Sequence, residues 1–186
     1  KDGQKVIGSK INLFCDCLGV SGGWTPAVHL FTQSGGKLRF RDEDQTFIPD
    51  SYPSDQLSIG ACNGDLTLDE ILNNVPESLK NFLNIKNTEY ANLEVLSSTN
   101  KSKRNIWLLP SDKIFGKTKS FVDFQNDATA KDIKLALREG FRSIEHVKRY
   151  TTTGMGTDQG KLGNMHALGI ISETADAKMS KLGTTT

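Results

Sequence analysis

Residues 127–161 read DATAKDIKLALREGFRSIEHVKRYTTTGMGTDQGK, a stretch that predicts two short helices leading into a glycine-rich joint. The first helix has Thr129 as its N-cap with Asp132 three residues later, and Gly140 supplies the C-terminal stop. Its apolar face, spaced as a helix requires, consists of Ile133, Ala136 and Leu137. Such a one-sided pattern indicates a helix that packs against other helices.

Two further helices are expected downstream. Ser143 would cap the second, whose core face carries Ile144 and Val147, and Gly154 would end it. LGNMHALGIISETA, residues 162–175, would form the third helix. Its apolar side carries Met165, Leu168 and Ile171. The sequence therefore predicts a compact three-helix module over residues 120–175.

The joint VKRYTTTGMGTDQGK, residues 147–161, holds more cations, hydroxyls and glycines than a helix connection needs. A bound phosphate requires backbone N–H groups, hydroxyl donors and a nearby cation, and the start of the third helix would add its dipole. The groups on offer are Lys148, Arg149, Thr151, Thr152, Thr153, Gly154, Gly156, Gly160 and Lys161. Asp158 would repel an anion unless it caps the helix. The residues alone leave a second interpretation open, a helix end, a loop and a new N-cap with the lysines in solvent.

Residues 1–75 read as β-rich with some helix. Strands are expected at INLFCDCLGV (11–20) and LSIGACNG (57–64), and a short strand with a polar turn at KLRFRDEDQTFI (37–48). LTLDEILNNV (66–75) follows as a helix, with Thr67 and Glu70 as its capping box. A strand, a glycine turn and a helix start can hold phosphate or ribose, but any α/β protein needs such turns. GACNG also lacks the full G-x-G-x-x-G fingerprint.

The remaining segments suggest a connector and a tail. Residues 76–119 read as a partly helical connector that contains the boundary between the two regions. Within it, NIWLLPSD (105–112) is expected to be a strand that docks onto another domain. Because the sequence opens on Lys1 in what reads as mid-domain material, we expect the chain to be a section of something longer.

Composition excludes several classes of function. The 23 basic and 22 acidic residues give a net charge of +1, so no overall field recruits nucleic acid or a membrane, and any anion site must be local. No apolar run is long enough to span a bilayer. The odd number of cysteines argues for a reducing, cytoplasmic setting rather than a disulfide framework. Cys15, Cys17 and Cys62 are expected to be buried as small hydrophobes.

No metal site or catalytic group is predicted from the residues. The Cys15–x–Cys17 pair has no second pair of Cys or His at zinc spacing. His29, His146 and His166 lie beside no nucleophile or carboxylate at catalytic spacing. We therefore expect these histidines to be structural or surface residues, and the chain alone to carry no general base or nucleophile.

Residues 122–161, VDFQNDATAKDIKLALREGFRSIEHVKRYTTTGMGTDQGK, resemble the central helical module of the α subunit of heterotetrameric sarcosine oxidase. VSGGWTPAVHLFTQSGGKLRF (20–40) and SIGACNGDLTLDEIL (58–72) are similar to the end of that subunit's pyridine-nucleotide-binding domain. The resemblance implies an order of four segments. These are an α/β fragment of a dinucleotide-binding domain (1–75), the connector (76–119), a small all-α module (120–175) and a linker towards a folate-binding domain outside this chain (176–186).

The helical module is in turn similar to the [2Fe–2S]-binding domain of bacterioferritin-associated ferredoxin. In that family four cysteines hold the cluster, and here the matching positions are Asp123, Gln125, Asp158 and Gly163. Because such clusters need Cys ligands, no iron–sulfur cluster is expected. A loop once shaped around a cluster could instead offer its amides to a flavin phosphate.

The resemblance also implies an activity, cofactors and partners. Such enzymes oxidatively demethylate sarcosine, reduce O2 to H2O2 and pass the one-carbon unit to tetrahydrofolate. FAD and the folate would be bound outside this chain, and FMN would lie at the interface with the β subunit. The γ and δ subunits complete the heterotetramer.

The matching positions suggest two sets of cofactor residues. For the FMN phosphate the candidates are Lys148, Arg149, Thr152, Thr153, Gln159 and Lys161. For NAD they are Gly60, Asp65, Leu66 and Thr67. In flavin-dependent relatives an acidic residue usually follows the glycine, whereas Ala61 stands here, so Asp65 or Thr67 would have to supply the ribose contact.

Two other functions compete with this one. The chain could be an assembly module that docks partner subunits and binds no cofactor. It could also be the equivalent subunit of an enzyme that oxidises another secondary amine, such as an opine or dimethylglycine.

Overall fold

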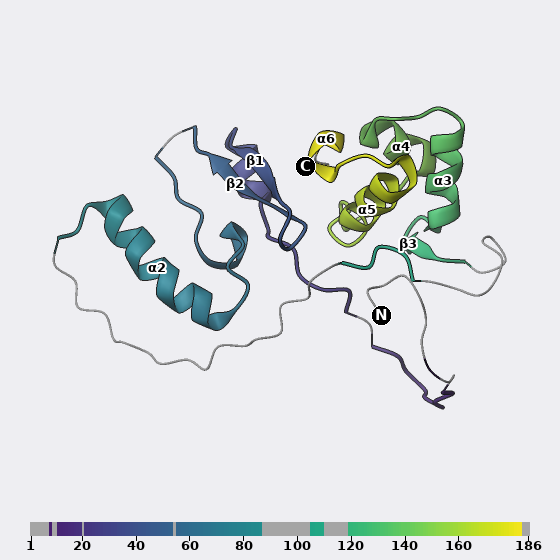
Figure 1. Cartoon of the computed structure of the whole chain (residues 1–186), viewed down its shortest axis with the longest axis horizontal. Helices are drawn as coiled ribbons and strands as arrows, with labels where there is room; N and C mark the ends of the chain where they lie inside the picture. Colours follow the sequence, from purple (N-terminus) through teal and green to yellow (C-terminus); the bar gives the residue numbers. More distant parts are fainter. Residues whose placement is uncertain are drawn as a thin grey trace. The chain divides into compact units, whose positions relative to one another are not determined.

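The computed structural model describes residues 8, 11–19, 21–53, 55–86, 105–109 and 119–183 (Figure 1). The chain divides into two compact units, one formed by residues 10–104 and the other by residues 1–9 with 105–186. Across the described ranges, no helix combines the length and apolar character needed to cross a membrane.

The first unit is built around a β-hairpin. Helix α1 (His29–Gln33) precedes strand β1 (Lys37–Arg41), which pairs antiparallel with β2 (Thr46–Ser51). The polar residues between the strands form the turn, and Gln45 adopts a left-handed φ of 55° there. The strand with a polar turn predicted at residues 37–48 is thus confirmed, as the first strand and the turn of this hairpin.

The core of this unit lies between α1 and the hairpin. Phe31 is 5% exposed and its ring meets that of Tyr52 edge-on, with 4.9 Å between centroids. Phe47 and Ile48 of β2 are also buried, and the Phe47 ring packs against Phe40 at 5.1 Å. Buried apolar groups of α1 and β2, together with the half-buried Phe40 of β1, therefore hold the hairpin in place.

A turn of 3-10 helix, η1 (Gly60–Asn63), leads to helix α2 (Leu68–Leu83). The capping position expected at Thr67 is confirmed, since its backbone N–H donates to the Glu70 carboxylate at 3.3 Å. The helix continues past Val75, so the expected start of the connector falls inside α2. Because this unit contains strands and helices, its mixed α/β character agrees with the sequence, while its assignment to a dinucleotide-binding domain stays a prediction.

Two strand predictions in this unit are wrong. Residues 11–19 and 57–59 contain no strand. Short apolar runs form strands only where a partner strand supplies hydrogen bonds, and none of the described segments pairs with them. Cys15 and Cys17 are exposed rather than buried, so that prediction is also wrong. Cys62 is half-buried and its thiol donates to the carbonyl of Ile59 at 3.0 Å.

The second unit is a helical module with a small two-stranded ribbon. Strands β3 (Phe121–Asp123) and β4 (Ala128–Thr129) pair antiparallel. The helices are α3 (Ala130–Arg138), α4 (Ile144–Thr151), α5 (Asn164–Ala175) and the short α6 (Met179–Leu182). The three predicted helices are confirmed, but the module is not all-α and it carries a fourth helical turn that the sequence analysis did not predict.

The predicted signals of α3 are confirmed. The Thr129 hydroxyl bonds to the Asp132 carboxylate at 2.6 Å, and the Thr129 amide donates to the same carboxylate at 2.8 Å. At the other end Gly140 has a φ of 98° and donates to the carbonyl of Leu137 at 3.1 Å. The helix is therefore capped at its start and ended at its C-terminus by the residues that the pattern indicated.

The end of α4 differs from the prediction. The helix stops at Thr151, where Thr152 adopts a left-handed φ of 59°, and not at Gly154. Ser143 holds the expected N-cap position, but its side chain makes no capping hydrogen bond. The helix ends early because the hydroxyls of the next threonines bond locally to one another and to the backbone, which competes with helical bonding.

The core of the module is formed by α3, α4 and α5. Its least exposed large side chains include Ile133, Val147, Leu168, Ile170 and Ile171. Trp107 joins this core from outside the helices, because its ring lies against Gly169, where any Cβ would clash with it, and meets the His166 ring at 5.9 Å. The strand expected at NIWLLPSD is absent from residues 105–109, which belong to the same compact unit as the helices and contact them through Trp107. Residues 110–112 lie outside the described residues.

Candidate functional site

Asp123, at the end of β3, ties the joint to the rest of the module. One carboxylate oxygen accepts the amides of Gln125 at 2.8 Å and Asn126 at 3.1 Å. The other accepts the amide of Gly154 at 2.7 Å, from the middle of the joint. Burial would raise the pKa of Asp123, but the N–H groups of Gly154, Asn126 and Gln125 outweigh it and hold the pKa below its usual value. A carboxylate of the chain itself therefore occupies one of the joint's amides.

Gln125 and Asn126 make further bonds across the same gap. The Gln125 carbonyl oxygen accepts the amide of Thr157 at 2.6 Å and its hydroxyl at 2.8 Å. The Asn126 side chain donates to the carbonyl of Thr152 at 3.1 Å. The turn after β3 and the joint are thus cross-linked at three points along the joint.

Close packing accounts for the surplus of glycines. A Cβ at Gly154 or Gly160 would collide with the Asn164 side chain, and one at Gly156 would collide with Gln125. A Cβ at Gly163 would lie 2.8 Å from the carbonyl oxygen of Val122. These glycines therefore have a structural role in addition to any role in binding.

The three threonines of the joint have different surroundings. Thr153 is fully buried and its hydroxyl bonds to that of Thr151 at 2.7 Å, which in turn donates to the Val147 carbonyl at 2.8 Å. Thr152 is exposed, with its hydroxyl turned onto the Thr151 carbonyl at 2.6 Å. Of the threonines predicted to contact FMN, only Thr152 lies at the surface.

The cations of the joint face solvent. Arg149 and Lys161 are exposed and Lys148 is half-buried, and no carboxylate among the described residues forms an ion pair with them. Gln159 is also exposed and its side-chain amide donates to the Gly156 carbonyl at 3.0 Å. Asp158, expected either to repel an anion or to cap, accepts the amide of Gly160 at 3.2 Å and so acts as a local cap.

The four positions that match cluster cysteines hold polar side chains or none. Asp123 and Gln125 bond to the joint, Asp158 caps the turn before α5, and Gly163 lies against the backbone of β3. Within the described ranges, no three His, Cys, Asp or Glu side chains are grouped so that they could hold a metal ion. The side-chain oxygens of Asp123, Gln125 and Asp158 already accept hydrogen bonds from backbone N–H groups.

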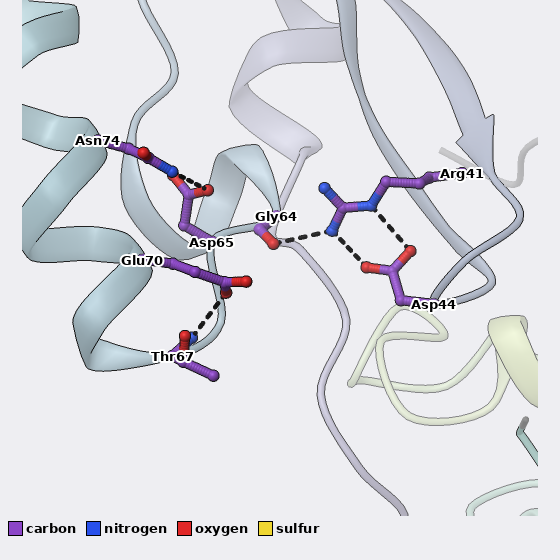
Figure 2. A network of polar contacts seen from close by, with 7 residues as sticks. All are labelled: Arg41, Asp44, Gly64, Asp65, Thr67, Glu70 and Asn74. Atoms are coloured by element: carbon purple, nitrogen blue, oxygen red, sulfur yellow. Dashed lines mark hydrogen bonds and ion pairs between the residues drawn. The ribbon is translucent and has the colours of Figure 1, made fainter. Parts of the chain in front are cut away.

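A second candidate site is the segment of residues 60–67, which runs from the start of η1 to the N-cap of α2 and is called the link below; Figure 2 shows part of it. Gly60 is buried with a φ of 66°, and Leu66 is 37% exposed. The Asp65 carboxylate accepts the side-chain amide of Asn74 at 3.0 Å, and Thr67 is tied to Glu70. The structure thus brings the predicted residues Gly60, Asp65, Leu66 and Thr67 together on one short link, anchored to α2 at two points.

Arg41 is a contact of this link that the sequence analysis did not identify. Its guanidinium forms a two-point bond with Asp44 and also donates to the carbonyl of Gly64 at 2.8 Å (Figure 2). The sequence could indicate only the pairing of Arg41 with Asp44, three residues later in the polar turn. It could not indicate the bond to Gly64, which lies 23 residues away.

Comparison with known proteins supports the resemblance over the whole length of the chain. The family named sarcosine oxidase A3 domain matches residues 117–186. The chain is 36% identical over 181 residues to the sarcosine oxidase subunit alpha of Rhizobium meliloti (strain 1021), a match covering 92% of this chain and 17% of that subunit. The subunit from Corynebacterium sp. (strain U-96) is 33% identical, over 100% of this chain and 20% of its own length.

The chain spans about a fifth of the length of the curated relatives it matches. The crystal structure of L-proline dehydrogenase from P. horikoshii is similar over 86% of this chain and 34% of that chain, at a TM-score of 0.49 and 19% identity, which is too low to assign the fold. The sequence matches cover both units and exceed 30% identity. On this basis the chain belongs to the sarcosine oxidase α-subunit family, of which it represents one section.

Proposed function

We propose that this chain acts within an α subunit of a sarcosine oxidase and helps to bind two nucleotide cofactors, FMN and NAD. The complete enzyme would oxidise the N-methyl group of sarcosine to leave glycine, reduce O2 to H2O2 and pass the one-carbon unit to tetrahydrofolate. The observation that carries this proposal is sequence identity above 30% to two such subunits across both units. FAD, tetrahydrofolate and the amine would be bound by other parts of the enzyme, and the β, γ and δ subunits would be its partners.

The proposed FMN contact is the exposed side of the joint. Lys148, Arg149 and Lys161 supply positive charge with no carboxylate of the described chain paired to them, and Thr152 and Gln159 of the same joint are also exposed. A phosphate attracts such groups through charge-assisted hydrogen bonds. Thr153 would contribute indirectly, because its buried hydroxyl fixes the fold of the joint. The amides of Gly154 and Thr157 already have acceptors, so side chains would supply most of the donors.

The proposed NAD contact is the link formed by Gly60, Asp65, Leu66 and Thr67. The start of α2 leaves first-turn amides without helical partners, as every helix does, and these favour a phosphate. Among the described residues Asn74 bonds to one oxygen of the Asp65 carboxylate, and the other oxygen would accept a ribose hydroxyl. A half-exposed Leu66 would offer an apolar contact.

The FMN contact is tested by removing its two adjacent cations. In the complete α subunit that carries this section, co-expressed with its partner subunits, we expect Lys148→Ala with Arg149→Ala to lower the FMN content. A lost hydrogen bond to a charged group costs about 1.5–3 kcal/mol, so losing two should weaken retention of FMN by more than about tenfold. Flavin fluorescence after denaturation and proteolysis measures FMN per complex.

The matched control removes two exposed lysines of the same module, Lys131→Ala with Lys178→Ala. This variant changes the net charge of the complex equally, and its FMN content should equal that of the wild type. If the Lys148/Arg149 variant also retains the wild-type amount of FMN, the joint does not hold the flavin phosphate.

Subunit assembly is a second function that one observation favours. Phe124 in the turn after β3, Met155 in the joint and Leu162 directly after the joint are 77%, 57% and 76% exposed. Large apolar side chains exposed together favour a protein contact. If Met155→Asp with Leu162→Asp abolishes co-purification of the partner subunits, while the Lys148/Arg149 variant keeps its FMN, assembly is the main role of the joint.

A further inference from the structure

The link contains two glycines, one at the start of η1 and one directly after it. Outside η1 itself, the described backbone bonds within residues 60–67 run from Gly64 to Ala61 and from Asp65 to Gly60, both at 3.2 Å. Gly60 and Gly64 have left-handed φ values of 66° and 93°. Glycine has the largest conformational freedom to lose on folding, so this link depends on outside contacts for its conformation.

Arg41 supplies such a contact from the end of β1. Its Nη2 donates to the carbonyl oxygen of Gly64 at 2.8 Å (Figure 2). The same guanidinium bonds to the Asp44 carboxylate through Nε at 2.9 Å and through Nη2. The side chains of both residues are only partly exposed, at 25% and 29%. The bond to Gly64 therefore comes from a guanidinium that is already fixed in its plane by a two-point contact.

The charge state of this pair is stable. The hydrogen bond to Asp44 raises the pKa of Arg41 further above its ordinary value. Burial would raise the pKa of Asp44, but its contacts outweigh burial and lower it, with the hydrogen bonds from Arg41 the largest of them. Both groups therefore stay ionised across the neutral range, and the contact to Gly64 does not switch with pH there.

Gly64 fits Arg41 closely. A Cβ at position 64 would lie 2.7 Å from Arg41 Nη2 and 2.8 Å from Ile48 Cγ2, and the left-handed φ disfavours any other residue. The backbone of the link can therefore approach the hairpin only because no side chain intervenes. On the far side, Asn74 and Glu70 of α2 hold Asp65 and Thr67.

We infer that Arg41 is a positioning residue of the nucleotide site: through Asp44 and the Gly64 carbonyl it fixes the link that presents Asp65 and Thr67. The inference rests on the proposed NAD contact. Arg41 touches no ligand itself. It acts by limiting the conformations of residues 60–67, which lowers the entropy that nucleotide binding would otherwise lose.

The experiment compares Arg41 with Arg39, two residues earlier on the same strand. Arg39 is 54% exposed and pairs at 3.6 Å with Asp50, which belongs to β2 and not to the link. Hydrogen exchange of this chain should show amides of residues 60–67 exchanging about tenfold faster in Arg41→Ala, from the loss of one charge-assisted bond. Arg41→Lys should not rescue protection, because an ammonium group lacks the fork that holds Asp44 and Gly64 together. Arg39→Ala should exchange like the wild type.

Nucleotide binding provides the second readout. In the complete enzyme, with NAD as the probe, we expect Arg41→Ala to raise the Kd about tenfold while FMN content stays unchanged. Asp44→Asn keeps the shape of the hairpin and removes the group that orients Arg41, so it should change both readouts in the same direction by less. This second variant keeps the test decisive if Arg41→Ala disturbs the hairpin.

The outcomes separate the inference from the proposed function. Unchanged exchange of residues 60–67 in both Arg41→Ala and Asp44→Asn would overturn the positioning role. It would also be overturned if Asp65→Asn weakens NAD binding while Arg41→Ala and Asp44→Asn bind NAD as the wild type does. If neither Asp65→Asn nor Arg41→Ala changes NAD binding although exchange rises, the nucleotide site itself is wrong, and the inference falls with it.

Discussion

The two units of the chain differ in where their apolar side chains lie. Helix α3 buries four of its nine residues and α5 buries five of its twelve, so the helical module has a core of its own. Helix α2 of the other unit buries none of its sixteen residues, and Leu68, Phe82 and Leu83 are 59%, 45% and 56% exposed. An amphipathic helix that buries nothing gains little from packing. The comparison indicates that the module is stabilised by its own packing, whereas α2 lacks cover from the described part of the chain.

The units resemble each other in how a charged side chain holds a glycine turn. In the module, the Asp123 carboxylate accepts the Gly154 amide, and in the other unit the Arg41 guanidinium donates to the Gly64 carbonyl. The polarity is opposite, but in each case a side chain distant in sequence fixes a left-handed glycine. A glycine-rich loop can therefore be explained by a contact within the chain before a ligand is invoked.

The substitution with the largest expected effect on stability tests whether the module has its own core. Ile171→Ala removes a fully buried side chain of α5 and should lower the free energy of unfolding by about 2–5 kcal/mol. Leu83→Ala in α2 is its matched control, because that side chain is 56% exposed and should change the value by less than about 0.5 kcal/mol. Urea unfolding in a Trp24→Phe background, followed by fluorescence of Trp107, measures the stability of the module. Similar losses in both variants would contradict the comparison.

A smaller effect is expected from the carboxylate that holds the joint. Asp123→Asn should destabilise the module by about 1–3 kcal/mol at neutral pH, because the buried amide of Gly154 and two partly buried amides lose a charged acceptor. The backbone N–H groups lower the pKa of Asp123 in the folded state. Its stabilisation is therefore complete above the unfolded value of about 3.9 and is lost as the pH falls through the folded pKa.

The same urea titrations between pH 7 and pH 3 check the sign of this effect. The difference between wild type and Asp123→Asn should shrink at the acidic end. Asp127→Asn, an exposed carboxylate in the same turn, is the control and should leave stability unchanged at each pH. A difference that grows on acidification would show that Asp123 is not held as an ionised acceptor.

Local signals predicted the module well. Thr129, Asp132 and Gly140 mark the ends of α3 by bonds within a few residues, which a sequence pattern can encode. Strands depend on distant partners, so apolar runs such as residues 11–19 gave wrong predictions. The early end of α4 was missed because it depends on the geometry of threonine hydroxyls, for which spacing gives no signal.

The sites were predicted less completely than the fold of the module. The residue types at the joint indicated an anion, but the pattern gave no sign that Asp123 takes the Gly154 amide from 31 positions away. Arg41 and Gly64 are likewise 23 positions apart. Contacts of this range follow from the assembled fold, so the sequence alone could indicate cations and glycines but not which backbone groups remain available.

The smallest expected effect compares the N-caps of the two units. The Thr129 hydroxyl at the start of α3 bonds to Asp132, whereas the buried Thr67 hydroxyl at the start of α2 makes no hydrogen bond with the described residues. Thr129→Ala should therefore cost about 1 kcal/mol and Thr67→Ala only a few tenths, since only the first loses a bond. Urea unfolding followed by far-UV circular dichroism measures both. If Thr67→Ala lowers the free energy of unfolding more than Thr129→Ala does, this expectation is wrong. Helix α2 would then depend on its N-cap more than α3 does, as expected of a helix with little packing.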